Sequence, residues 1–107
     1  MEQPNLNYLK SLSNGNTLLE ERFLLIIKNE FPTDVEEFYQ YLNNKNYVAA
    51  SKKVHKIKHK IAFLGLEKGC STTILFENNL KKYSIELLPE FEAILETINQ
   101  FIKTLEL

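Results

Sequence analysis

The sequence predicts an all-α fold, an antiparallel four-helix bundle with a short additional helix at the N-terminus. Leu, Ile, Lys, Glu and Asn dominate the 107 residues, which include only three glycines and three prolines, and this mixture favours helices over strands. Apolar residues recur at spacings of three and four, and no run alternates apolar with polar residues as a half-buried strand would. A chain of this length is expected to form one domain, here residues 1–107, and to bury roughly two-thirds of its unfolded surface.

The predicted elements begin with a short helix over residues about 4 to 13, for which Pro4 suits the first turn. A loop follows at residues 13 to 16. Thr17 and Glu20 then match the capping box that opens a helix, in which a hydroxyl and a carboxylate bond reciprocally to free backbone amides. These signals predict that the second helix starts at residue 17.

The second predicted helix contains Pro32. A proline inside a helix removes one backbone hydrogen bond and costs about 3 kcal/mol, and Thr33 with Glu36 could cap a separate helix after it. The spacing of apolar residues nevertheless runs unbroken through this point, which indicates that one face stays buried. We therefore predict a single kinked helix over residues about 17 to 44, ended by an Asn-rich turn.

Three further helices complete the predicted bundle. The third runs from about 46 to 66, with residues 68 to 71 as its stop and turn. The fourth covers residues about 71 to 84 and the fifth begins at about 87, both with apolar residues at spacings of three and four. Amphipathic helices joined by short connections pack antiparallel around one apolar axis.

Charge and cysteine content narrow the class of protein. The formal net charge of −1 gives no global attraction to nucleic acid or to an anionic membrane. Cys70 is the single cysteine, so the chain forms no internal disulfide and a reducing compartment fits best. The N-terminus does not read as a secretory signal, and no apolar run approaches the roughly 20 residues of a membrane span. We expect a cytoplasmic monomer with neither nucleic acid nor membrane as a partner.

His55 is the most informative residue. When the third helix is laid out at about 100° per residue with His55 at 0°, the apolar residues that fall between about 180° and 260° predict the core face: Ala50, Val54, Ile57, Ile61 and Leu64. His55 therefore points to solvent, with Lys58 about 60° away. Neutral imidazole is a nucleophile near pH 7, and an ammonium group one turn later would meet an anion bonded to the ring. This spacing predicts a phosphorylatable histidine.

The surroundings of His55 predict a docking surface made of Val48, Ser51, Lys52, Lys56, His59, Ala62 and Leu66. Small or aliphatic residues on the exposed strip lie among lysines, and residues 52 to 60 contain no acid. A basic patch with an apolar strip suits an acidic partner that has an apolar contact of its own. We assign Lys53 and Lys60 to an ordinary solvated face.

The chain resembles the histidine-containing phosphotransfer (HPt) domains of bacterial-type phosphorelays. Their motif has an acceptor histidine, an apolar residue two positions later, a lysine three later, usually a glycine four later, and another glycine ten later. This sequence has His55, Ile57, Lys58, His59 and Gly65 at those positions. The order of the helices also matches, from about residue 6 to 105. One departure is that His59 replaces the usual glycine, and Lys60 follows it in place of a small residue.

The resemblance implies a phosphocarrier and not an enzyme. His55 would accept a phosphoryl group from a receiver-domain aspartate or from a histidine kinase, and pass it to a response-regulator receiver, while Lys58 stabilises the phosphoryl charge. The expected partners are a receiver domain, a hybrid histidine kinase, or both. No cofactor is expected on this chain, because the receiver supplies the Mg²⁺ pocket. An imidazole at His59 could hinder docking, bond to the phosphoryl group or shift partner preference, so the alternative is an HPt-fold interaction or scaffold module that lacks transfer.

Simpler interpretations exist for each residue. His55 could be an ordinary solvated histidine. His59 is disfavoured as the acceptor because the residue three positions later is Ala62, which offers no charge to a phosphoryl group. His55 and His59 could share a zinc ion, although two histidines need further ligands that the sequence does not obviously place. Six of the seven phenylalanines predict core rather than a cofactor site: Phe23, Phe31, Phe38, Phe76, Phe91 and Phe101. Cys70 is most simply a loop residue.

Overall fold

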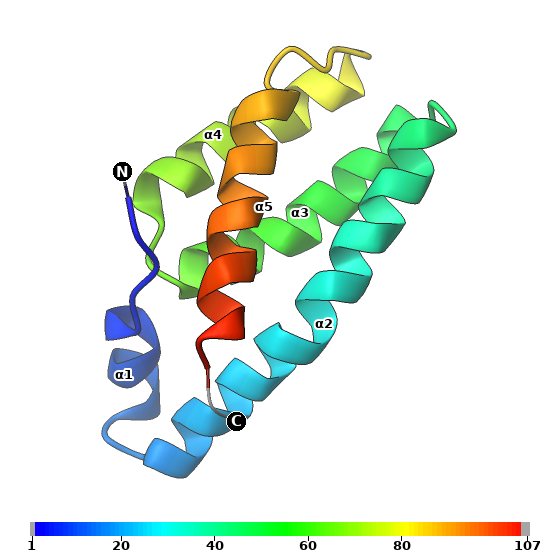
Figure 1. The fold of residues 1–107 in the computed structure, drawn as a ribbon. Helices are drawn as coiled ribbons and strands as arrows, with labels where there is room; N and C mark the ends of the chain where they lie inside the picture. The colour runs from blue at the N-terminus through cyan, green and yellow to red at the C-terminus, as the bar shows by residue number, and fades with distance from the viewer. Residues whose placement is uncertain (1, 106–107) are drawn as a thin grey trace.

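The computed structural model describes residues 2–105, which form five helices and no strand (Figure 1). The helices are α1 (Asn7–Ser13), α2 (Thr17–Asn43), α3 (Tyr47–Phe63), α4 (Glu67–Lys81) and α5 (Leu88–Lys103). The all-α prediction is therefore confirmed for these residues. Helix α3 lies between α2 and α4 and packs closely against both, while α5 packs on α4 and α1 packs on α2. None of these helices is both long enough and apolar enough to cross a membrane.

The core is built from the apolar stripes that the spacing predicts. Phenylalanine rings from three helices meet at its centre. The centroid of the Phe91 ring lies 4.8 Å from that of Phe76 and 5.3 Å from that of Phe38. From α3, the whole predicted core face is buried: Ala50, Val54, Ile57, Ile61 and Leu64. Phe23 and Phe101 are only half-buried and pack against the edge of this cluster. Since one face of α3 is fully occupied in this way, the opposite face is left for solvent.

The N-terminal segment is not helical before Asn7, so the predicted start of the first helix at residue 4 is wrong. Residues 2–5 instead bond to the turn between α3 and α4. The Asn5 amide donates to the Leu64 carbonyl at 2.8 Å, and the Glu2 carboxylate accepts from the Lys68 and Gly69 amides at 2.9 Å each. A carboxylate at these free amides stabilises the positive end of α4.

Helix α2 runs through Pro32 without interruption, which confirms the continuous helix and excludes a fresh start at Thr33. Its predicted capping box at Thr17 is wrong by one residue. The cap is Asn16, whose side-chain oxygen accepts from the Leu19 amide at 3.1 Å. Asparagine satisfies a free amide at this position as well as a hydroxyl does.

The turn after α3 lies at Gly65, so the predicted stop at residues 68 to 71 is wrong. Gly65 has a φ of +75°, and its amide and the next donate to the carbonyls of Ala62 and Ile61, as in a Schellman helix terminus. Helix α4 consequently starts at Glu67 rather than at residue 71. It also ends at Lys81, three residues before the predicted end.

Candidate functional site

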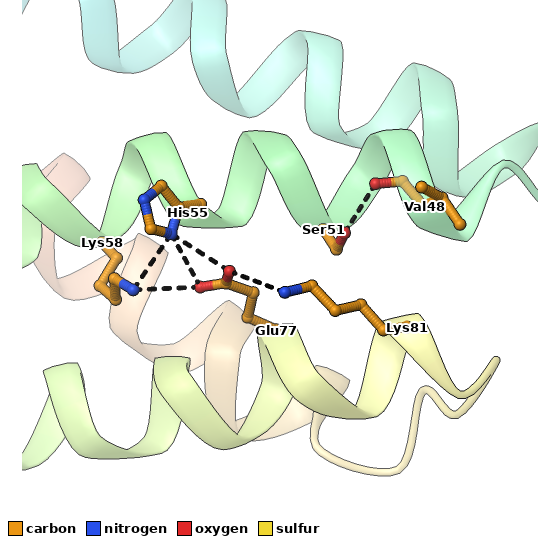
Figure 2. A network of polar contacts seen from close by, with 6 residues as sticks. All are labelled: Val48, Ser51, His55, Lys58, Glu77 and Lys81. Atoms are coloured by element: carbon orange, nitrogen blue, oxygen red, sulfur yellow. Dashed lines mark hydrogen bonds and ion pairs between the residues drawn. The ribbon is translucent and has the colours of Figure 1, made fainter.

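His55 lies on the part of α3 that faces α4, and its side chain is 53% exposed. Its Nδ1 atom is 3.1 Å from Oε2 and 3.3 Å from Oε1 of Glu77, a residue of α4 (Figure 2). The Lys58 Nζ atom is 3.2 Å from Oε1 of the same carboxylate and 3.2 Å from His55 Nδ1. Lys81 approaches Glu77 Oε2 at 3.6 Å. The predicted pair of His55 and Lys58 is thus joined by a carboxylate from the neighbouring helix.

The carboxylate determines which nitrogen of His55 carries the proton. An ionised carboxylate only accepts hydrogen bonds and an ammonium group only donates them. Lys58 therefore donates to Glu77, and Nδ1 bonds to Glu77 only if it carries hydrogen. We assign the Nδ1–H tautomer of neutral His55 on this ground, since Nδ1 contacts both oxygens of Glu77. The Lys58 Nζ atom, 3.2 Å from Nδ1, is then a close neighbour of that nitrogen and not its hydrogen-bond donor. The lone pair is then on Nε2, which lies on the side of the ring away from Glu77 (Figure 2).

Glu77 keeps its charge although only 10% of its side chain is exposed. Burial alone raises the pKa of this carboxyl, but the hydrogen bond and charge of Lys58, followed by those of His55, outweigh it, and the net pKa lies below the usual 4.5. Sequence analysis missed Glu77. The available signal was its position on the buried stripe of α4, between Thr73 and Leu80, because a buried acid needs a cationic or donor partner.

The residues predicted to dock a partner differ in their exposure. Val48, Lys52, Lys56, His59 and Ala62 are exposed, as predicted. An open hollow of about 410 Å³ borders His55 and is lined by residues of both helices, including Val48, Lys52 and Glu77. The ring of His59 lies 5.1 Å from that of His55, at an interplanar angle of 89°.

Ser51 and Leu66 are buried, with 1% and 2% exposure, so their predicted place on the exposed surface is wrong. Ser51 lies at the margin of α3 beside α4, and its hydroxyl donates to the Val48 carbonyl at 2.6 Å. Leu66 follows the turn at Gly65 and folds into the core, because α3 ends three residues earlier than predicted.

The lysines of α3 do not form one free basic patch. Lys53 pairs with Glu37 at 3.0 Å, and Lys56 pairs with Asp34 at 3.2 Å. The bond and charge of Asp34 raise the pKa of Lys56. Lys60, predicted to be solvated, has a side chain only 8% exposed and contacts both Asp34 and Glu30 of α2. These acids are on another helix, so the acid-free stretch of sequence overstated the local positive charge.

Within residues 2–105, no group of three or more His, Cys, Asp or Glu side chains is arranged to hold a metal ion. Comparisons with protein-family models, with curated proteins and with solved structures find no match to this chain. The candidate function therefore depends on the geometry around His55 and on the motif that the sequence carries.

Proposed function

We propose that this chain is the phosphocarrier of a phosphorelay, with the antiparallel four-helix bundle of the HPt domains that its sequence resembles. His55 accepts a phosphoryl group from a receiver-domain aspartate or a histidine kinase and passes it to a response-regulator receiver. The observation that carries the proposal is a half-exposed imidazole whose Nδ1 is held by Glu77, with no hydrogen bond to Nε2 from any residue between 2 and 105. A histidine held in this way is oriented and has its nucleophilic nitrogen toward solvent.

The transfer step follows from this geometry. The Nε2 lone pair attacks phosphorus in line, the bond from phosphorus to the aspartyl oxygen breaks, and its electron pair leaves with the carboxylate. The Nδ1 proton stays between the ring and Glu77. Phosphorylation at Nδ1 is disfavoured because a phosphoryl group there would meet the Glu77 carboxylate, 3.1 Å away. The product is therefore expected to be phosphorylated on Nε2.

Lys58 contributes positive charge near the phosphoryl group. In the unphosphorylated chain its ammonium group bonds to Glu77. Its flexible side chain lets the ammonium group swing toward a phosphoryl group on Nε2, where it offsets the charge of the phosphoryl oxygens. The chain supplies the nucleophile and this charge, and the receiver supplies its acidic Mg²⁺ pocket, so the chain acts as a carrier without turnover of its own.

The direct test uses a panel of receiver domains phosphorylated with radiolabelled acetyl phosphate and Mg²⁺. Wild type and His55→Gln are incubated with each receiver, and His59→Gln serves as the matched control. We expect label on wild type and on His59→Gln and none on His55→Gln, with all three equally helical by circular dichroism. Equal labelling of His55→Gln would remove His55 from the mechanism.

The second candidate function is an interaction or scaffold module that keeps the fold without transfer. The observation in its favour is His59, whose ring stands against His55 where the motif has a glycine. The same experiment separates the two functions. A receiver that binds wild type in a titration, but never labels it, would support the scaffold.

A further inference from the structure

A second surface feature lies between α2 and α5, whose side chains meet in the core at Phe38 and Phe91 and at the surface through the bond from Tyr39 to Glu92. A groove of about 490 Å³ opens there, and neither His55 nor any other residue of α3 lines it. Phe31 and Leu95 form its buried floor, with 2% and 6% exposure, and the more exposed apolar lining comes from Pro32, Val35 and the ring of Tyr39. The groove is thus separate from the proposed phosphorylation site.

Three carboxylates also line this groove: Glu36 from α2, and Glu92 and Glu96 from α5. No lysine, arginine or histidine lines it, and none of the three carboxylates is in an ion pair within residues 2–105. The acids that face α3 are in contrast all paired with its lysines or with His55. The lysines of α3 therefore neutralise acids on the side of α2 that faces α3. The three carboxylates of the groove, on the side of α2 that faces α5, keep their negative charge without a cationic partner.

Two of these carboxylates are oriented by neighbouring donors. The Tyr39 hydroxyl donates to Glu92 Oε2 at 2.6 Å, and the Gln100 amide donates to Glu96 Oε1 at 2.7 Å. Glu92 and Glu96 are four residues apart on α5, where like charges destabilise a helix. Each ionised carboxylate still has unused acceptor positions. The arrangement concentrates negative charge beside an apolar floor, and a cationic ligand would relieve the repulsion.

We propose that this groove docks a basic amphipathic helix of a partner protein. Apolar side chains of that helix pack on Pro32, Val35 and the ring of Tyr39, and its lysines or arginines pair with Glu36 on one wall and with Glu92 and Glu96 on the other. A groove between two helices accepts a third helix through an apolar stripe, whereas a simple polyamine would leave Pro32, Val35 and Tyr39 without an apolar contact. A second copy of this chain fits less well, because most lysines of α3 are already paired.

The probe is a labelled Leu/Lys amphipathic peptide of about 18 residues, roughly five helical turns, and the comparison peptide has glutamate in place of every lysine. Binding is followed by fluorescence anisotropy at low and high salt, and the site is mapped by amide chemical shifts. The test variant is Glu92→Gln with Glu96→Gln. The matched control is Glu86→Gln with Glu90→Gln, which makes the same charge change at exposed positions outside the groove.

We expect the lysine peptide to bind in a salt-dependent manner, to shift amides along the groove and to lose roughly tenfold in affinity with the test variant. The control pair should retain affinity within about twofold, and the glutamate peptide should not bind. Equal losses in both variants, or shifts centred on α3 and α4, would overturn the proposal. His55→Gln should bind the peptide as tightly as wild type does. A failure of peptide binding would therefore leave the proposed phosphoryl transfer untouched, and a failure of transfer would leave the groove proposal untouched.

Discussion

The two sides of α3 carry similar charged clusters with different consequences. Toward α2, the buried Asp34 carboxylate contacts Lys56 and Lys60; toward α4, the buried Glu77 carboxylate contacts Lys58 and His55. At the centre of each cluster, one buried acid from a neighbouring helix contacts two groups of α3, with Glu30 added on the first side and Lys81 on the second. Only the second cluster contains a group that can be neutral and nucleophilic at pH 7. A paired, buried acid therefore does not itself mark a functional site. The exposed imidazole of His55 is what distinguishes the cluster facing α4 as the candidate site.

The α2-facing cluster is expected to matter for stability, and its disruption gives the largest predicted effect. Lys60→Met removes an ammonium group 2.9 Å from Asp34, whose side chain is 1% exposed. A buried charge that loses its partner destabilises a protein by about 3 kcal/mol, here moderated by Lys56. Urea unfolding measures this loss, and phosphoryl transfer by the folded protein should be unchanged.

The matched control for Lys60→Met is Lys53→Met, which breaks the more exposed pair with Glu37. Exposed pairs contribute about 0 to 1 kcal/mol, so this variant should unfold close to wild type. If both variants lost the same stability, burial would not distinguish the two ion pairs and the structural role of the Asp34 cluster would be refuted.

The α4-facing cluster should behave in the opposite way. Lys58→Ala removes the charge assigned to the phosphoryl oxygens, and we expect transfer from a phosphorylated receiver to slow by about tenfold, equivalent to about 1.4 kcal/mol. Rapid-quench kinetics of label transfer measure the rate, and circular dichroism should show a retained fold. Lys56→Ala is the control, because this lysine is two residues away but bonds to Asp34. Equal slowing in both variants would mean that general positive charge, and not Lys58, is responsible.

Glu77→Gln keeps a hydrogen-bond acceptor for His55 but removes the charge. Replacing a charge-assisted bond by a neutral one costs about 1 kcal/mol, so we expect transfer to slow roughly fivefold.

The Glu77→Gln variant also changes how stability depends on acidic pH. Since the pKa of Glu77 is lower in the folded chain, its contribution is complete above about pH 4.5 and is lost as pH falls through the folded value.

Urea unfolding between pH 3 and pH 6 checks the acid prediction for Glu77. Wild type should lose more stability than Glu77→Gln below about pH 4.5, since only wild type has this carboxyl to protonate. If stability fell with pH in the same way for both proteins, the charges of Lys58 and His55 would not lower the pKa of Glu77. The assigned tautomer of His55, which requires an ionised Glu77, would then lose its basis.

The sequence was sufficient for features that depend on one helix. The fixed rotation per residue placed five residues of α3 on the core face and therefore turned His55 outward. These five are Ala50, Val54, Ile57, Ile61 and Leu64. The same reasoning could not find Asp34 or Glu77 as partners, because each comes from a different helix and contact depends on tertiary packing. Lysines that looked like a free patch in the sequence are consequently paired.

The errors at the turn after α3 have a local physical cause. Gly65 and Gly69 both satisfy the rule that glycine follows a helix, but only Gly65 adopts a positive φ. Gly69 is buried in the first turn of α4, where its amide donates to the Glu2 carboxylate. Sequence alone does not separate these two uses of glycine, and the wrong choice placed Leu66 on the exposed surface.

The smallest predicted effect concerns His59, the residue that departs from the motif. Its exposed ring lies edge-to-face with His55, and under the proposed function it would occupy space next to the acceptor that a docking receiver would need. We expect His59→Ala to speed transfer by about threefold, under 1 kcal/mol. Alanine is preferable to the motif glycine, which costs about 1 kcal/mol in a helix interior; His59→Gly should show the same rate change with lower stability. Slower transfer in His59→Ala would instead identify His59 as a donor to the phosphoryl group, and the cluster facing α4 would then include a second histidine.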